Sequence, residues 1–299
     1  MPSTTANGIS VEYETCGDPS DPPILLVMGL GAQLITWPDE FVEGLAQRGF
    51  FVIRHDNRDV GKSTWFDEAG PPNLVAAIAG DLNPAYLLGD MADDALGLLD
   101  ALDIETAHVV GASMGGMIAQ AVAIKAPSRV RSLVSIMSTT GAPEVGQPSP
   151  EIFPMLLRPA PASRDEAIEV GVESWRAIGS PASPTDDTEA RQRVAQAYDR
   201  AFHPVGTARQ LVAIVASGDR TADLRQLDVP TLVIHGDADP RVNISGGKAT
   251  AEAIPGATIR IVAGMGHDLP APLLPAIVED IATHAHAHDD RLGDAESAA

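Results

Sequence analysis

One serine stands in a setting that suits nucleophilic chemistry. The segment Gly111–Gly115 reads GASMG and directly follows the apolar run at 107–110. A serine in this pattern sits on a sharp turn between a strand and a helix, where its hydroxyl stands clear of the sheet and the helix N-terminus faces a developing oxyanion. We therefore identify Ser113 as a candidate nucleophile. The alternative is a serine that only caps the helix expected at 114–125.

A serine hydroxyl needs a base within hydrogen-bond reach, and His267 is the candidate. It ends the glycine-rich segment Gly264–His267, just beyond the last expected strand. General base catalysis by such a group is worth about 10²–10⁴ in rate. The remaining histidines considered for this role are expected to be packed or solvated instead: His55, His108, His235, His284, His286 and His288. The last three alternate as the ligands of a metal site do, but a solvated C-terminal tail is the favoured interpretation.

Two carboxylates after the strand expected at 229–235 compete to orient the imidazole. Asp239 is preferred over Asp237 because it lies deeper in the turn that follows the strand. Its role would be to fix the imidazole tautomer and to stabilise the imidazolium. An acid after the preceding strand is a further possibility, but that position carries no carboxylate.

Two backbone N–H groups are expected to bind the oxyanion. One belongs to Met114, at the positive end of its helix, and the other to Leu30, in the Gly-Leu-Gly turn after an earlier strand. The loss of one such donor costs about 10²–10³ in turnover.

These residues are separated by an alternation of strands and helices that indicates an α/β fold. Short apolar runs suit parallel strands that are buried on both faces, and amphipathic spacing marks helices. The expected strands are 9–15, 24–28, 50–53, 107–110, 130–137, 229–235 and 257–262. The expected helices are 37–48, 90–102, 114–125, 189–201 and 273–285. Residues 65–84 are expected to form an irregular loop over the site.

The alternation stops near residue 138 and returns at 229. We expect residues 141–220 to form a helical cap, folded over the strand ends where open α/β sheets bind ligands. The core would then consist of residues 1–140 and 221–299. Apolar cap residues are expected to line the substrate pocket: Ile152, Phe153, Met155, Leu156 and Trp175.

Composition excludes several classes of partner. The 20 Lys and Arg against 41 Asp and Glu give a net charge of −21, which repels nucleic-acid backbones and anionic membranes. Cys16 is the single cysteine, so no intrachain disulfide can form. The sequence contains neither a signal-peptide pattern nor an apolar run long enough to insert into a membrane. We therefore expect a cytoplasmic protein.

The chain resembles the α/β-hydrolase superfamily and, within it, the serine carboxylesterases related to aclacinomycin methylesterase. The matching stretches are LVMG at 26–29, WPDEF at 37–41, Asp59 with Gly61 and Ser63-Thr64, AHVVG at 107–111, SMG at 113–115, PTLVI at 230–234, DP at 239–240 and GMGH at 264–267. The order Ser, Asp, His is the one that this superfamily uses.

The resemblance implies a mostly parallel eight-stranded sheet. We expect helices on both faces of this α/β-hydrolase sheet and a helical cap inserted after the sixth strand. The resemblance also implies the triad Ser113–Asp239–His267, oxyanion donors at Leu30 and Met114, and neither a metal nor an organic cofactor. Most of the superfamily has His-Gly at the oxyanion turn, whereas this chain has Met28-Gly29. The cap shows no resemblance, so the family's substrates do not carry over.

We predict a serine hydrolase that cleaves small-molecule carboxylic esters through an acyl-enzyme, as a monomer or homodimer. Two alternatives would use the same triad, namely a carbon–carbon bond hydrolase and a cofactor-free perhydrolase. A non-catalytic ligand-binding protein of the same fold is a third alternative.

Overall fold

The computed structural model describes residues 1–292, in which eight strands form one sheet. The strands are β1 (Ser3–Ala6), β2 (Ile9–Cys16), β3 (Pro23–Val27), β4 (Phe51–His55), β5 (Ala107–Ala112), β6 (Val130–Ile136), β7 (Thr231–Gly236) and β8 (Thr258–Val262). Their spatial order is β1-β2-β4-β3-β5-β6-β7-β8. The pairs β1–β2 and β2–β4 are antiparallel, and all other neighbours are parallel. The expected mostly parallel eight-stranded sheet is confirmed.

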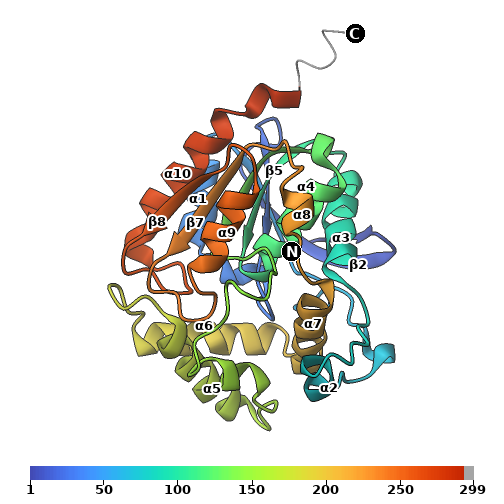
Figure 1. The fold of residues 1–299 in the computed structure, drawn as a ribbon, viewed down its shortest axis with the longest axis vertical. Helices are drawn as coiled ribbons and strands as arrows, with labels where there is room; N and C mark the ends of the chain where they lie inside the picture. Colours follow the sequence, from blue (N-terminus) through green and yellow to red (C-terminus); the bar gives the residue numbers. More distant parts are fainter. Residues whose placement is uncertain (293–299) are drawn as a thin grey trace.

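Helices cover both faces of this sheet, as Figure 1 shows. On one face lie α1 (Asp39–Ala46) and α10 (Leu274–His286), and on the other α3 (Leu88–Ala101), α4 (Met114–Lys125), α8 (Thr221–Leu224) and α9 (Ser245–Ala253). Each face of the sheet packs against its helices in a hydrophobic core of its own, the first on the side of α1 and α10, and strand β3 contributes to both. Ile24 and Leu26 pack into the first core, whereas Leu25 and Val27 pack into the second, because successive strand side chains point to opposite faces.

The inserted helices lie between β6 and β7, which confirms a helical insertion after the sixth strand. They are α5 (Arg164–Ile178), α6 (Asp187–Arg200) and α7 (Pro204–Ser217). Figure 1 shows them gathered at one end of the sheet, with α2 (Leu74–Ile78) beside α7. The cap boundaries at 141 and 220 remain a prediction. Short 3-10 helices complete the described chain at Leu34–Thr36, Asp67–Ala69, Pro127–Arg129, Phe153–Leu157, Ala271–Leu273 and Asp289–Leu292.

The inserted helices are held in two different ways. Helices α5 and α6 share a small apolar cluster around Ile168 and Val172, supported by exposed ion pairs such as Arg191–Glu169. Helix α7 instead reaches the core through Arg209, which forms two hydrogen bonds of 2.7 Å with the buried carboxylate of Asp59. An exposed pair contributes little to stability, whereas breaking a buried pair leaves a charge without compensation. Helix α7 is therefore the firmer attachment of the insertion.

Three segments differ from the sequence-based expectations. The short strand β1 was not expected, and it forms a hairpin with β2 through Asn7 and Gly8, both at positive φ. The loop expected at 65–84 contains helix α2, whose first turn is capped by the Asn73 side chain. The histidines near the C-terminus are not a solvated tail, since His284 bonds to the Pro230 carbonyl and His286 to that of Arg48. Residues 293–299 lie outside the described structure.

No helix within residues 1–292 combines the length and the apolar character that a membrane span requires.

Candidate active site

Ser113 sits on a strained turn between β5 and α4. Its φ of 58° and ψ of −121° are rare for a residue with a side chain. The flanking glycines are required by close backbone approach. A Cβ on Gly111 would lie 2.1 Å from the Gly115 carbonyl oxygen, and one on Gly115 would lie 1.9 Å from that of Val27. The strain and the glycines together hold the Ser113 hydroxyl above the carboxyl end of the sheet.

A continuous relay of hydrogen bonds joins Ser113 to an imidazole and a carboxylate. His267 Nε2 lies 2.9 Å from Ser113 Oγ, and His267 Nδ1 lies 2.7 Å from Asp239 Oδ2. Because an ionised carboxylate only accepts hydrogen bonds, Nδ1 carries the proton and Nε2 accepts the Ser113 hydroxyl. The three residues follow the ends of β5, β7 and β8, which are parallel and therefore end at the same edge. The structure thus brings together the three residues selected from the sequence.

The environment of Asp239 keeps its carboxylate ionised. Burial by itself would raise the pKa of Asp239, but the charge of His267 and the hydrogen bonds that the carboxylate accepts hold this pKa below its ordinary value. The backbone N–H groups of Arg241 and Val242 each donate to Oδ1 at 2.9 Å. Asp237, the competing acid, accepts instead from the Gly264 N–H at 2.7 Å and does not contact the imidazole.

The expected oxyanion donors Leu30 and Met114 lie on segments next to Ser113. A Cβ on Gly29 would lie 3.1 Å from the Ser113 Cβ, so the turn that carries Leu30 packs directly against Ser113. Within the described chain, neither the Leu30 N–H nor the Met114 N–H donates to a protein acceptor. Both donors are thus available to a ligand.

The other strand-associated histidines have structural surroundings. Burial lowers the pKa of His55 to about 4, and it also lowers that of His108 to about 4, against the opposing effect of the Asp289 carboxylate. His235 Nε2 lies 2.8 Å from the Val242 carbonyl and so supports the turn after β7.

Sequence reasoning missed a set of contacts that fix the histidine loop to the inserted helices. The His267 N–H donates to the Ile178 carbonyl at 2.7 Å. Ser180 Oγ accepts the Gly266 N–H at 2.8 Å and donates to the buried carboxylate of Asp268 at 2.5 Å. Ile178 ends α5, and Ser180 follows that helix, so the inserted helices position the imidazole. No local pattern marks this role, because the partners are about 86 residues apart in the chain.

Gln210 performs the same task for the oxyanion turn. Its Oε1 accepts the Gly31 N–H at 2.8 Å, and its Nε2 donates to the Arg58 carbonyl at 2.7 Å. Gln210 is buried on α7, the helix that Arg209 ties to the core. The turn that carries Leu30 is therefore clamped by the firmer of the two attachments.

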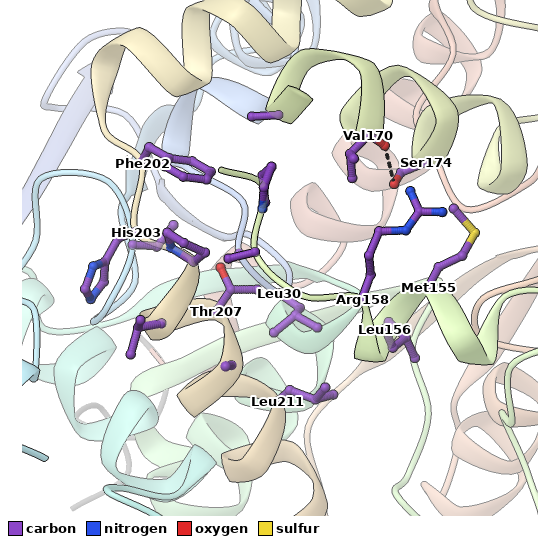
Figure 2. A pocket seen from close by; sticks show the side chains of 18 of the residues that line it. Leu30, Met155, Leu156, Arg158, Val170, Ser174, Phe202, His203, Thr207 and Leu211 are labelled. Carbon is purple, nitrogen blue, oxygen red and sulfur yellow. Dashed lines mark hydrogen bonds between the residues drawn. The ribbon is translucent and has the colours of Figure 1, made fainter. Parts of the chain in front are cut away.

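A cavity of about 550 Å³ lies between the inserted helices and the sheet edge. Figure 2 shows side chains from three parts of the insertion facing one another across it, with Leu30 of the oxyanion turn at the core side. Met155 and Leu156 come from one segment, Val170 and Ser174 from α5, and Thr207 and Leu211 from α7. Ser113 is half-buried and does not itself line the cavity, so a bound molecule would extend from the hydroxyl past Leu30.

Three of the five expected pocket residues line this cavity, namely Ile152, Met155 and Leu156. Phe153 is 44% exposed and lies outside it. Trp175 lines a separate cavity of about 290 Å³. The register of α5 explains this position, because its face at 167, 170, 174 and 178 points to the larger cavity. The aromatic residues Tyr198 and Phe202, which do line it, were not selected from the sequence.

Among residues 1–292, histidine, cysteine and acidic side chains form no group of three or more that could hold a metal ion. The arrangement of the site is instead suited to nucleophilic attack by a hydroxyl that is assisted by a base.

Comparison with known proteins identifies the family. A family model described as alpha/beta hydrolase fold matches residues 22–270. Rhodomycin D methylesterase DauP of Streptomyces sp. (strain C5) is 33% identical over 306 residues, covering 95% of this chain and 97% of that protein. Rhodomycin D methylesterase DnrP of Streptomyces peucetius is 32% identical with the same coverage. The solved structure of the meta-cleavage product hydrolase CumD from Pseudomonas fluorescens IP01 has a TM-score of 0.77 at 21% identity, covering 96% of this chain and 98% of that chain. The chain therefore belongs to the alpha/beta hydrolase fold family and is a hydrolase.

Proposed function

We propose that the protein hydrolyses carboxylic esters of small molecules through an acyl-enzyme on Ser113. The observation that carries this proposal is the relay from Ser113 Oγ to His267 at 2.9 Å and from His267 to Asp239 at 2.7 Å, built on a strained turn. The methylesterase relatives support an ester as the bond that is cleaved.

Each residue has a defined role in the proposed mechanism. Ser113 Oγ attacks the ester carbonyl as its proton moves to His267 Nε2, and Asp239 stabilises the imidazolium that results. The negative oxygen of the tetrahedral intermediate accepts hydrogen bonds from the backbone N–H groups of Leu30 and Met114. His267 then protonates the leaving alkoxide, which releases the alcohol and leaves the acyl group on Ser113. A water molecule, deprotonated by His267, attacks this acyl group. His267 then returns the proton to Ser113 Oγ as the bond to the acyl carbon breaks, which releases the carboxylic acid and restores the free enzyme.

A series of p-nitrophenyl esters from C2 to C16 tests the proposal. We expect turnover by the wild type and a loss of about 10³-fold or more for Ser113→Ala. Ser20→Ala, in an exposed turn, is the matched control and should retain full activity. The preferred chain length would report how much of the cavity the acyl group fills. An inactive wild type, or an Ser113→Ala variant as active as the wild type, would refute the ester assignment.

The same relay can serve the alternatives considered from the sequence. A carbon–carbon bond hydrolase would leave the esters intact but cleave a vinylogous diketone, with the same dependence on Ser113. A perhydrolase would require hydrogen peroxide as acyl acceptor, and a ligand-binding protein would turn over none of these. Assembly as a monomer or homodimer and a cytoplasmic location remain predictions from the sequence.

A further inference from the structure

The charge of the cavity is opposite to that of the whole chain. The protein has 41 acidic and 20 basic residues, yet no Asp or Glu is among the described residues that line the 550 Å³ cavity. The lining includes instead Arg158, Arg241 and His203, set among largely apolar side chains. A cavity for a neutral apolar molecule needs no arginine, so each of these basic side chains requires an explanation.

Two of these three basic side chains already have partners. Arg158, labelled in Figure 2 beside Met155, forms an ion pair with Glu173 at 2.6 Å. The His203 ring stacks on Trp65 with centroids 4.1 Å apart, and its Nε2 lies 3.3 Å from an Asp67 carboxylate oxygen. These contacts give both side chains a structural role at the cavity wall.

Arg241 differs from them because, within residues 1–292, its guanidinium has neither a hydrogen-bond nor an ion-pair partner. Its backbone N–H is bound by Asp239, but its side chain is not. Arg225 shares this lack of a partner, but it is exposed to water, whereas Arg241 is partly buried in the cavity wall. Burial lowers the pKa of Arg241, and the negative charge of Asp239 opposes this effect. None of the Arg241 nitrogens is among the fully buried polar atoms that lack a partner, so they face the solvent-filled cavity, where an anion would give them a charged acceptor.

The position of Arg241 ties it to the reacting groups. It lies two residues after Asp239 in the turn beyond β7, and the Ser149 N–H fixes this turn by donating to the Pro240 carbonyl at 2.8 Å. Arg241 therefore lines the cavity from the same turn that carries Asp239. A ligand group bound there would belong to the same molecule whose ester lies at Ser113.

We propose that Arg241 is a specificity-determining residue that binds a carboxylate carried by the substrate, so that the preferred substrates are half-esters of dicarboxylic acids. The inference rests on the proposed function, because it assigns a second group to a substrate whose ester reacts at Ser113. A carboxylate fits better than a phosphate, because one planar guanidinium offers two parallel donors and a single charge to match one monoanion. The negative surface would slow the approach of such a substrate, and the cavity would retain it once it has bound.

Two pairs of methyl esters test the proposal, each with a carboxylate matched by an isosteric isopropyl group. Monomethyl adipate is paired with methyl 6-methylheptanoate, and monomethyl suberate with methyl 8-methylnonanoate. For Arg241→Met we expect the ratio of kcat/KM for half-ester over neutral ester to fall about 10- to 100-fold, mainly through KM for the half-ester. Arg241→Lys should restore part of the ratio, and Arg225→Met should leave it unchanged. An unchanged ratio in Arg241→Met would overturn the proposal, whether both rates fall together or neither falls.

A binding measurement separates this inference from the proposed function. If the wild type cleaves no ester at all, the proposed function fails, and the affinity of monomethyl adipate is then measured by calorimetry on Ser113→Ala. A weakening of about 10-fold or more on adding Arg241→Met would support the anion site without any catalysis. Equal affinities in the two variants would refute it.

Discussion

The sheet edge and the inserted helices contribute to the site in different ways. At the sheet edge, each reacting residue follows a strand of its own and is positioned within a few residues of it, as Ser113 is by β5. The inserted helices supply none of the three relay residues. They supply contacts from far along the chain, such as Ser180 on the histidine loop and Gln210 on the oxyanion turn.

The reactivity of the site is therefore encoded by residues close together in the sequence, whereas the orientation of its groups is encoded by residues far apart in the sequence. A Gly-x-Ser-x-Gly turn produces its geometry locally, because close backbone contacts leave no space for side chains at Gly111 and Gly115. The orientation of His267 and Leu30 depends instead on where helices α5 and α7 dock. Variants in the two regions should therefore fail differently.

The largest expected effect comes from the relay itself. Asp239→Asn should lower kcat about 10⁴-fold, because an amide favours the wrong tautomer of His267. Asp237→Asn is the matched control, since its amide oxygen can still accept the Gly264 N–H, and it should stay within about threefold of wild type. Steady-state kinetics on one p-nitrophenyl ester measure both variants. A larger loss for Asp237→Asn than for Asp239→Asn would reverse their roles.

The next effect is on stability. Gly115→Ala places a Cβ 1.9 Å from the Val27 carbonyl oxygen and should lower the free energy of unfolding by about 3 kcal/mol or more. Gly89→Ala, in α3 with no atom within 4 Å of the added Cβ, should instead raise it by up to about 1 kcal/mol. Denaturant unfolding of the two variants measures the contrast, and similar changes in both would contradict the packing argument.

A smaller effect is expected from the inserted helices. Gln210→Ala frees the Gly31 N–H and should lower kcat about tenfold, because the oxyanion turn loses its clamp. It should also lower the unfolding midpoint, because Gln210 is buried and its two backbone partners are left without a hydrogen bond. Gln147→Ala, on the exposed loop after β6, should change neither quantity. If Gln210→Ala raised only KM, the clamp would contribute equally to binding of the substrate and of the transition state.

The smallest effect concerns the pH dependence of stability at Asp268. Burial raises the pKa of this carboxyl, only partly offset by its hydrogen bonds with Ser180. A raised pKa stabilises the fold at low pH, and this stabilisation is lost as the pH rises through the folded-state pKa. Asp268→Asn resembles the protonated carboxyl, so it should increase the free energy of unfolding at pH 7.5, and the gain should shrink as the pH falls toward the ordinary value of 3.8.

Urea unfolding at several pH values measures the Asp268→Asn difference, with the exposed Asp81→Asn as control. A gain that grows on acidification would contradict the assigned direction.

The sequence predicted those parts of the molecule whose geometry is local. The strands of the parallel sheet are short apolar runs buried on both faces, and Ser113, Asp239 and His267 were selected because they follow such runs. Strand β1 was missed because four polar and small residues carry no apolar signal, although the Asn7-Gly8 turn was available as one. Trp175 and Phe153 were placed in the pocket because apolar character alone does not reveal which helix face meets the cavity. That face is set by docking, as Arg209 shows for α7.

Covalent labelling shows directly whether Ser113 is an activated nucleophile. The wild type, Ser113→Ala and His267→Ala are incubated with a fluorophosphonate, and the intact proteins and their peptides are examined by mass spectrometry. The account predicts one adduct per wild-type chain, located on Ser113, with no labelling of Ser113→Ala and labelling of His267→Ala slowed by orders of magnitude. An adduct on another residue, or a wild type that remains unlabelled, would contradict the claim that Ser113 is an activated nucleophile.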